Sequence, residues 1–230
     1  MKALSLIFAL ITVITPVITQ KTGLSKKYGF PLKMLCASFY LMTGIFSAVF
    51  AGKPTGYCIM VLCALIFGVL GDFFLEYNKK KLFFVGVLFF SLGHITYSSA
   101  FLFTGVNKAV SYIGTVLCIT LVIMAAIMVF AKVKLRLYGK KQLLLIYALI
   151  LVFSFSCAAV RGASELSAGN YLFGLCLIAG GLLFFASDIM IGVEKGGIKR
   201  PEILHYAVSY TYFAAQALFA LSILFSEVLI

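Results

Sequence analysis

Charge is scarce in this sequence, and acidic residues are scarcest of all. Of its 230 residues only 11% are charged and 7 are acidic, whereas 63% are hydrophobic. Soluble domains have roughly a quarter of their residues charged and about 45–50% apolar. A water-soluble domain of this length has too small an interior to hide so much apolar surface, so that class is excluded. Only a lipid bilayer suits such a chain, and we expect an integral membrane protein surrounded by membrane lipid.

Residues that usually bind metals or form disulfides are also few and badly spaced. The six cysteines form no CxxC pair and all lie inside apolar runs, so they predict neither a zinc ribbon nor a disulfide framework. With only two histidines, a catalytic zinc site of three histidines is impossible, although two histidines plus an aspartate are not excluded. We therefore expect no metal and no cofactor.

The net charge of +12 comes from basic residues that lie almost entirely in the short gaps between apolar runs. A nucleic-acid-binding protein needs a basic face interleaved with exposed polar surface, so we expect no nucleic-acid partner. Basic residues in short gaps instead set the membrane topology and contact anionic lipid.

Eight apolar runs of about 17–23 residues recur along the chain, and each is long enough to cross the ~30 Å hydrocarbon core as a helix. The connections are too short to separate domains, so we expect residues 1–230 to form a single transmembrane domain. The predicted fold class is all-α, an eight-helix transmembrane bundle. The expected helices cover about 3–19, 33–51, 56–77, 82–104, 109–131, 142–161, 170–192 and 204–226.

The distribution of lysine and arginine predicts the orientation of the bundle. The odd-numbered gaps hold 15 of these residues and the opposite side holds 4. By the positive-inside rule the first set is cytoplasmic, so both termini are on the other side. The first run could instead be a cleaved signal peptide, but it has no convincing small-residue cleavage site, and cleavage would leave the first basic gap outside. We favour a retained helix.

Three acidic residues lie in or near the ends of predicted membrane segments, where a buried carboxylate is costly and suggests a function. Asp72 and Glu76 are four residues apart near the end of the third helix, so they share one face. Asp188 lies at a similar depth near the end of the seventh helix. Pairing with a cytoplasmic lysine, or snorkelling to the interface, would explain each acid without a function, and this alternative is strongest for Glu76.

Three predicted helices carry polar side chains at three- and four-residue spacings, which places each set on one helical face. The fourth helix has Ser91, His94 and Ser98, with Tyr97 beside them. The eighth helix has His205, Ser209, Tyr212 and Gln216, and the second has Lys33, Cys36, Tyr40, Thr43 and Ser47. Such faces turn away from lipid, either as interhelical hydrogen-bond contacts or as the lining of a cavity. A face that combines histidine, tyrosine and glutamine favours the cavity.

The two halves of the chain contain similar motifs. Asp72 is followed 25 residues later by Tyr97, and Asp188 is followed 24 residues later by Tyr212. Both copies cross the membrane in the same direction, which predicts a parallel four-plus-four repeat about an axis along the membrane normal. Such symmetry would bring Asp72 and Asp188 toward one central site that opens to the cytoplasmic side.

Short motifs in the same order extend along nearly the whole chain. They are Lys33 after Pro31, Gly71-Asp72-Phe73-Phe74-Leu75, Gly93-His94 with Tyr97, Ser187-Asp188, and Tyr212 with Ala215-Gln216-Ala217-Leu218. In order, spacing and helix placement they resemble the YhhN-like lysoplasmalogenase family of eight-helix membrane proteins. Phe213 departs from the pattern, where a second tyrosine is expected.

The resemblance implies hydrolysis of the vinyl ether bond of a lysoplasmalogen, a lysophospholipid, to a fatty aldehyde and glycerophospho-ethanolamine or -choline. This chemistry needs a protonated carboxylic acid and a second carboxylate, a division of roles similar to that in glycoside hydrolysis. A low-dielectric cavity and a neighbouring carboxylate both favour the protonated acid. We therefore predict Asp72, Asp188 and His94 as catalytic residues, with the roles of the two aspartates unassigned. The predicted substrate-binding residues are Lys33, as a phosphate contact, and Glu76, Tyr97, Ser187, Tyr212 and Gln216.

Two other functional classes stay open. A proton-coupled transporter also uses intramembrane acids, a histidine and a repeat, although no Gly/Pro break interrupts these helices near the acids and both acids lie on one side. A non-catalytic scaffold would use the polar faces only for packing, whereas a serine lipase is disfavoured because the chain has no GxSxG motif. We expect a protein of a bacterial plasma membrane with its active site toward the cytoplasm, and the oligomeric state is left open.

Overall fold

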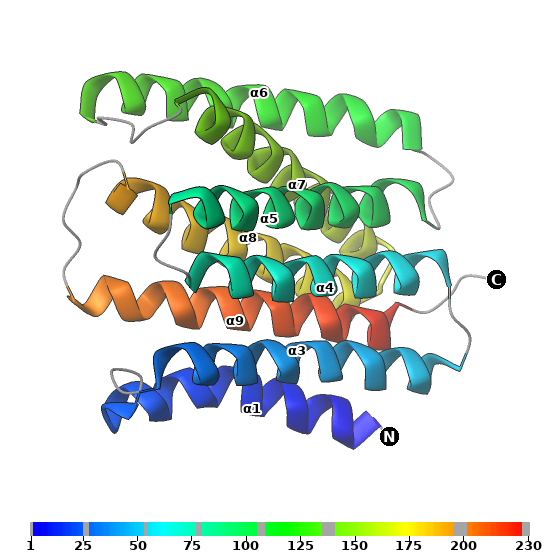
Figure 1. Ribbon diagram of the computed structural model, residues 1–230. Coiled ribbons are helices and arrows are strands. Elements are labelled where there is room, and N and C mark those ends of the chain that lie inside the picture. Colours follow the sequence, from blue (N-terminus) through cyan, green and yellow to red (C-terminus); the bar gives the residue numbers. More distant parts are fainter. Residues whose placement is uncertain are drawn as a thin grey trace.

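A computed structural model of the chain describes residues 2–24, 28–52, 55–76, 80–104, 109–134, 141–195 and 202–226. All regular structure within these ranges is helical. Eight long helices run in alternating directions and pack into one bundle (Figure 1). Their bounds are α1 Lys2–Lys21, α3 Gly29–Ala51, α4 Gly56–Glu76, α5 Lys80–Phe103, α6 Ala109–Lys134, α7 Lys141–Ser167, α8 Tyr171–Lys195 and α9 Glu202–Phe225.

The predicted all-helical fold is confirmed, and seven of the eight helices are long and apolar enough to cross a membrane. In α6 the described apolar stretch is the shorter Thr115–Ile127, so the eighth crossing stays a prediction. Large apolar side chains cover the outer faces, and Leu121 and Val122 are 69% and 70% exposed. Lipid accepts such a surface and water does not, so the protein is an integral membrane protein.

Packing between helices brings the two halves of the chain together. Helix α4 packs along α5 and α8 packs along α9, while α3 contacts α9 and α5 contacts α7. In Figure 1, α1 and α6 lie at opposite edges of the bundle, α1 against α3 and α9, and α6 mainly against α7. The contacts among the first four helices thus have counterparts among the last four. The parallel repeat requires such a correspondence, and the repeat itself stays a prediction.

The helix directions define two ends of the bundle. Helices α1, α4, α6 and α8 finish at the end where α3, α5, α7 and α9 begin, on the left of Figure 1. We call this the basic end, because most lysines and arginines of the sequence lie at or near these turns. Asp72 lies one turn before the last residue of α4, and Asp188 lies two turns before the last residue of α8. Both aspartates are therefore nearer to the basic end.

Helix α7 continues to Ser167, whereas the sequence pattern placed its end near residue 161. A buried ion pair one helical turn apart explains the difference, with 2.6 Å between Arg161 Nε and Glu165 Oε1. Arg161 also donates to the carbonyl of Thr104 at 2.8 Å, and Asn170 donates to Glu165 at 2.7 Å. Charges that satisfy one another in this way can stay inside a bundle, so they did not mark the helix end. This cluster lies at the end opposite to the basic end.

Candidate functional site

Asp72 is the centre of the first polar cluster. Its side chain is 2% exposed, and Oδ2 accepts hydrogen bonds from the Tyr212 hydroxyl at 2.7 Å and the Tyr40 hydroxyl at 3.3 Å. Lys33 Nζ lies 3.5 Å from Oδ1. These partners come from α3 and α9, which both pack against α4 beside its main neighbour α5. The site therefore depends on how α4 packs against the preceding helix α3 and against α9, which is distant in sequence.

The hydrogen bonds continue from Asp72 into the bundle. Gln216 Nε2 donates to the Tyr212 hydroxyl at 3.1 Å, and the Tyr97 hydroxyl donates to Gln216 Oε1 at 2.8 Å. All three of these side chains are buried. The hydrogen bonds therefore run in one direction, from Tyr97 through Gln216 and Tyr212 to Asp72. The network presents only donors to this carboxylate. We refer to Lys33, Tyr40, Asp72, Tyr97, Tyr212 and Gln216 as the Asp72 cluster.

Gly68 provides the space in which this cluster assembles. It lies one turn before Asp72, and a Cβ atom at this position would be 2.5 Å from Gln216 Nε2 and 3.1 Å from the Tyr40 hydroxyl. Separations below 3.0 Å force a side chain to move. Glycine here has a packing reason, because the polar side chains of α3 and α9 meet directly over the α4 backbone.

We expect Gly68→Ala to displace Gln216 and Tyr40 and to destabilise the folded protein by about 1–3 kcal/mol, as over-packing usually does. Activity should fall as well, because the hydrogen bonds to Asp72 lose their geometry. Thermal unfolding in detergent and the rate of product formation measure the two effects. Gly192→Ala in α8 is the matched control, since a Cβ there meets no atom of the described residues within 4 Å. Equal behaviour of the two variants would contradict the role assigned to Gly68.

Asp188 is the centre of a second polar cluster. Its Oδ2 accepts a hydrogen bond from the Tyr147 hydroxyl, and His94 Nε2 lies 3.5 Å from the same oxygen. Ser187 Oγ lies 3.3 Å from Oδ1 and also donates to the carbonyl of Phe184 at 2.8 Å. His94 is 3% exposed, and among the described residues neither of its ring nitrogens has a hydrogen-bond partner. We refer to His94, Tyr147, Ser187 and Asp188 as the Asp188 cluster.

The ring of Phe184 lies between the two clusters. Its centroid is 4.5 Å from that of His94 and 5.4 Å from that of Tyr212, with both pairs edge-on. Within the described part of the chain, no hydrogen bond or ion pair joins Asp72 to Asp188. The two carboxylates thus belong to neighbouring clusters that share an aromatic wall, and their surroundings differ.

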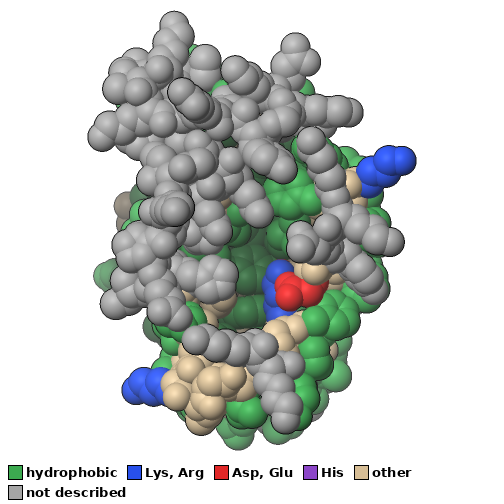
Figure 2. All heavy atoms as spheres, turned by 60° about the vertical axis from the view of Figure 1, so that its left-hand side comes forward, with side chains coloured by type: hydrophobic (Ala, Val, Ile, Leu, Met, Phe, Trp, Pro, Cys, Tyr) green, Lys and Arg blue, Asp and Glu red, His purple; other side chains and the backbone are tan. Residues whose placement is uncertain are grey.

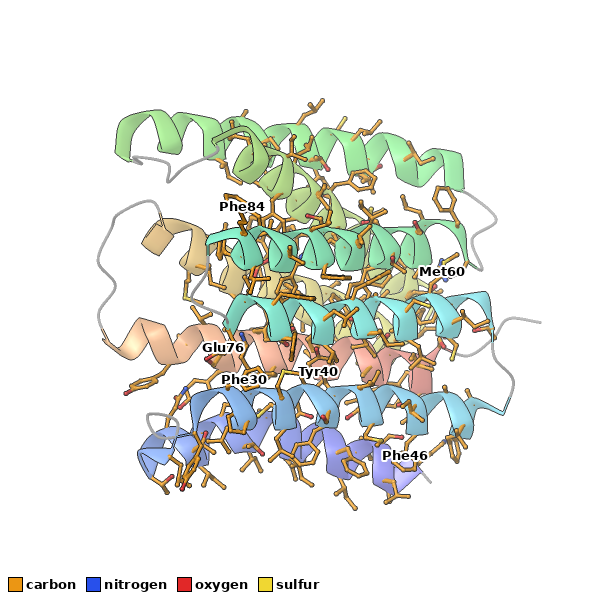
Figure 3. The ribbon with its side chains drawn as sticks, viewed as in Figure 1. Phe30, Tyr40, Phe46, Met60, Glu76 and Phe84 are labelled. Carbon is orange, nitrogen blue, oxygen red and sulfur yellow. The ribbon has the colours of Figure 1, made fainter. Side chains whose placement is uncertain are left out.

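Lys33 connects the Asp72 cluster to the surface. Its Nζ is also 3.6 Å from Glu76 Oε2, and the side chains of Lys33 and Glu76 are 26% and 37% exposed. In Figure 3, Glu76 and Phe30 lie together toward the basic end, with Tyr40 deeper in the bundle. Figure 2 shows a hollow with a hydrophobic floor and a basic and an acidic side chain in contact at its edge. An amphiphile could place its apolar tail and its headgroup there.

Every predicted site residue falls within the described part of the chain. Asp72, Lys33, Tyr97, Tyr212 and Gln216 form one cluster with Glu76 beside it, and Asp188, His94 and Ser187 form the other. Their catalytic and binding roles stay predictions. The side chain of His205, from the predicted stripe on the last helix, lies outside the described residues. In the described ranges, no three His, Cys, Asp or Glu side chains are arranged to hold a metal ion.

Two tyrosines that contact the aspartates were not among the predicted site residues. Tyr40 belongs to the polar stripe that begins at Lys33, so its spacing was a usable signal. Tyr147 has leucine or isoleucine three and four residues to either side, and the periodicity of the sequence could not single it out. Its role depends on the contact between α7 and α8, which only the fold brings together.

A bundle of membrane-spanning helices with two aspartates among buried hydroxyl and imidazole groups defines a polytopic membrane protein with an internal polar site. The chain matches the YhhN family over residues 30–223, and it belongs to this family. The resemblance inferred from the motifs is thereby confirmed. Helix α1 lies before the matched region.

Among curated proteins, the chain is similar to one described as a lysoplasmalogenase homolog of Dictyostelium discoideum. The two are 28% identical over 173 residues, which covers 66% of this chain and 55% of the relative. The match thus spans about half the length of that relative. No solved structure matches the chain.

Proposed function

We propose that this protein is a lysoplasmalogenase-like hydrolase that cleaves the vinyl ether bond of lysoplasmalogens. The observation that carries the proposal is a pair of aspartates with different partners, whose side chains are only 2% and 8% exposed and which lie in the half of the bundle nearer the basic end. Membership of the YhhN family and the similarity to the Dictyostelium lysoplasmalogenase homolog support it. The proposed products are a fatty aldehyde and a glycerophospho-ethanolamine or -choline.

Vinyl ether hydrolysis needs one acid and one base. A proton adds to the carbon β to the ether oxygen, and the oxygen lone pair forms an oxocarbenium ion with the other alkene carbon. Water attacks this carbon and loses a proton, which gives a hemiacetal. The hemiacetal hydroxyl then loses its proton as the bond to the glycerol oxygen breaks, the glycerol oxygen takes up a proton, and the aldehyde leaves. One carboxylic acid and one carboxylate can perform these steps.

In this mechanism Asp72 is the carboxylate. Two tyrosine hydroxyls donate to its Oδ2 and the Lys33 ammonium lies beside its Oδ1, so its surroundings match an ionised group that only accepts hydrogen bonds. Such a charge stabilises the oxocarbenium ion electrostatically. It also accepts the proton that water loses during attack. The hydrogen bonds from Tyr97 to Gln216 and from Gln216 to Tyr212 hold the Tyr212 hydroxyl in place.

Asp188 is the proposed acid. The described contacts of its carboxyl group are the hydroxyls of Tyr147 and Ser187 and the imidazole of His94, and none of these carries a permanent positive charge. Such surroundings suit a neutral carboxylic acid in the bundle interior. His94 is close enough to Asp188 to return a proton to it after each turnover. The reacting double bond would lie between the two clusters, against the ring of Phe184.

The position of the site suggests how the lipid is oriented. We propose that the alkenyl tail lies in the hydrophobic part of the bundle and that the phosphate lies near Lys33 at the basic end. From the positive-inside rule we expect this end to be cytoplasmic, so the substrate would come from the cytoplasmic leaflet. A bacterial plasma membrane is the expected location.

Purified protein incubated with a lysoplasmenylethanolamine is expected to release a fatty aldehyde. A lysophospholipid with a saturated ether in place of the vinyl ether should not be cleaved, because it has no alkene carbon to protonate. Aldehyde is measured by mass spectrometry after derivatisation. Absence of aldehyde with both ethanolamine and choline substrates would contradict the proposal and favour a proton-coupled transporter.

A further inference from the structure

Lys33 and Glu76 form a partly exposed ion pair at the outer edge of the Asp72 cluster. The Nζ of Lys33 is 3.5 Å from Asp72 and 3.6 Å from Glu76, whereas the carboxyl group of Asp72 is buried. Glu76 is thus the carboxylate of this group that an incoming ligand can reach. The pair presents one positive and one negative group side by side at the basic end.

Both members of the pair can bind a ligand without separating from each other. Charge-assisted N–H···O bonds are usually about 2.7–2.9 Å long, so contacts of 3.5 and 3.6 Å do not use up the donors of Lys33. A lysine ammonium has three donors and a carboxylate has about four acceptor positions. A phosphate can therefore approach Lys33 while a cation approaches Glu76.

We infer that Lys33 and Glu76 together bind a zwitterionic phosphoethanolamine headgroup, with the phosphate on Lys33 and the primary ammonium on Glu76. This inference rests on the proposed function in taking a lysophospholipid as the ligand. It adds that Glu76 selects the headgroup. The deeper carboxylate, Asp72, does not take part in this selection because Lys33 and two tyrosines already contact it.

Glu76 discriminates between headgroups because of the N–H groups of the ligand. A primary ammonium can donate directly to a carboxylate oxygen, whereas the trimethylammonium group of choline has no N–H and its methyl groups hold the nitrogen farther away. Proteins usually hold quaternary ammonium groups in cages of several aromatic rings. Phe30, which lies beside Glu76 in Figure 3, packs against Phe73 with ring centroids 5.8 Å apart. The Glu76 carboxylate is therefore a stronger determinant of headgroup choice than the aromatic rings beside it, and the site prefers ethanolamine.

Competitive binding of two lysophospholipids with the same saturated ether tail tests this inference. One carries phosphoethanolamine and the other phosphocholine, and neither has a vinyl ether to cleave. Native mass spectrometry of the detergent-solubilised protein in an equal mixture gives the ratio of bound lipids. The parent should retain the ethanolamine lipid roughly tenfold over the choline lipid, the effect of one charge-assisted hydrogen bond. Glu76→Gln should bring the ratio close to one, with choline binding unchanged or tighter because Lys33 loses a carboxylate partner.

Two control variants make the result specific. Glu76→Asp keeps the carboxylate and should retain a preference for ethanolamine. Glu194→Gln removes an acidic group from the end of α8, at the same end of the bundle, and should leave the ratio unchanged. The inference is overturned if the parent shows no preference, if Glu76→Gln keeps it, or if Glu194→Gln loses it equally. Because no cleavage is involved, failure here is independent of the aldehyde assay that tests the proposed function.

Discussion

Replacing Asp188 by asparagine is expected to lower the rate of aldehyde release roughly 10²–10⁴-fold, the usual contribution of a general acid. The amide has almost the same shape as the carboxyl group, and its oxygen can still accept the hydrogen bond from Tyr147. It cannot supply a proton to the alkene carbon. The effect should therefore fall on kcat, while binding of an uncleavable saturated-ether lipid stays close to that of the parent.

The thermal unfolding temperature of Asp188→Asn is the control for its fold. We expect only a small change, because an isosteric amide leaves no unpaired charge in the bundle. Retention of more than a tenth of the parent rate in a well-folded Asp188→Asn would contradict the role of Asp188 as the acid. Aldehyde formed in that case would have to derive its proton from another group, and His94 would be the first to test.

Replacing Asp72 by asparagine is expected to lower aldehyde release by a similar factor, roughly 10²–10⁴-fold, for a different reason. The variant keeps Asp188, the proposed acid. It loses the negative charge that stabilises the oxocarbenium ion and accepts a proton from water. Lys33 also loses one of its two carboxylate partners, so its positive charge becomes more available to the substrate phosphate. We therefore expect kcat to fall while binding of the uncleavable lipid is unchanged or tighter.

Tyr40→Phe is the matched control for Asp72→Asn. It removes one donor to Asp72 without removing the charge, and the hydrogen bond from Tyr212 at 2.7 Å remains. Its rate should lie between those of the parent and Asp72→Asn. An unchanged rate in Asp72→Asn would show that the reaction does not need this carboxylate, and the two-carboxylate mechanism would then be wrong.

The helices were predictable because the bilayer imposes one length and one composition on every crossing. The expected run 56–77 and the observed Gly56–Glu76 differ by one residue. The end of α7 was predicted too early because charged residues in the sequence look like the end of an apolar run. Arg161 and Glu165 instead pair with each other inside the bundle, and the helix continues past them. Internal pairing of charges cannot be read from hydropathy.

The candidate site was predictable where an acid lies inside an apolar run, as at Asp72 and Asp188, and where polar residues share a helical face. Tyr212 and Gln216 are four residues apart on α9, and their hydrogen bond follows from that spacing. Contacts between helices, such as those of Tyr147 with Asp188 and Tyr40 with Asp72, depend on which helices pack together and at what depth. The ring of Phe184 between the two clusters could not be inferred either, because phenylalanine in an apolar run carries no positional signal.

Hydrolysis of a lysoplasmenylethanolamine in deuterium oxide tests the central claim most directly. If a carboxylic acid of the protein protonates the alkene, the released aldehyde carries one deuterium on the carbon next to the carbonyl group, and the reaction is slower than in ordinary water. Immediate reduction of the aldehyde to its alcohol prevents later exchange, and mass spectrometry counts the label. The proposed mechanism predicts one deuterium per aldehyde from the parent protein and almost no product from Asp188→Asn. Aldehyde without deuterium, or no aldehyde at all, would contradict it.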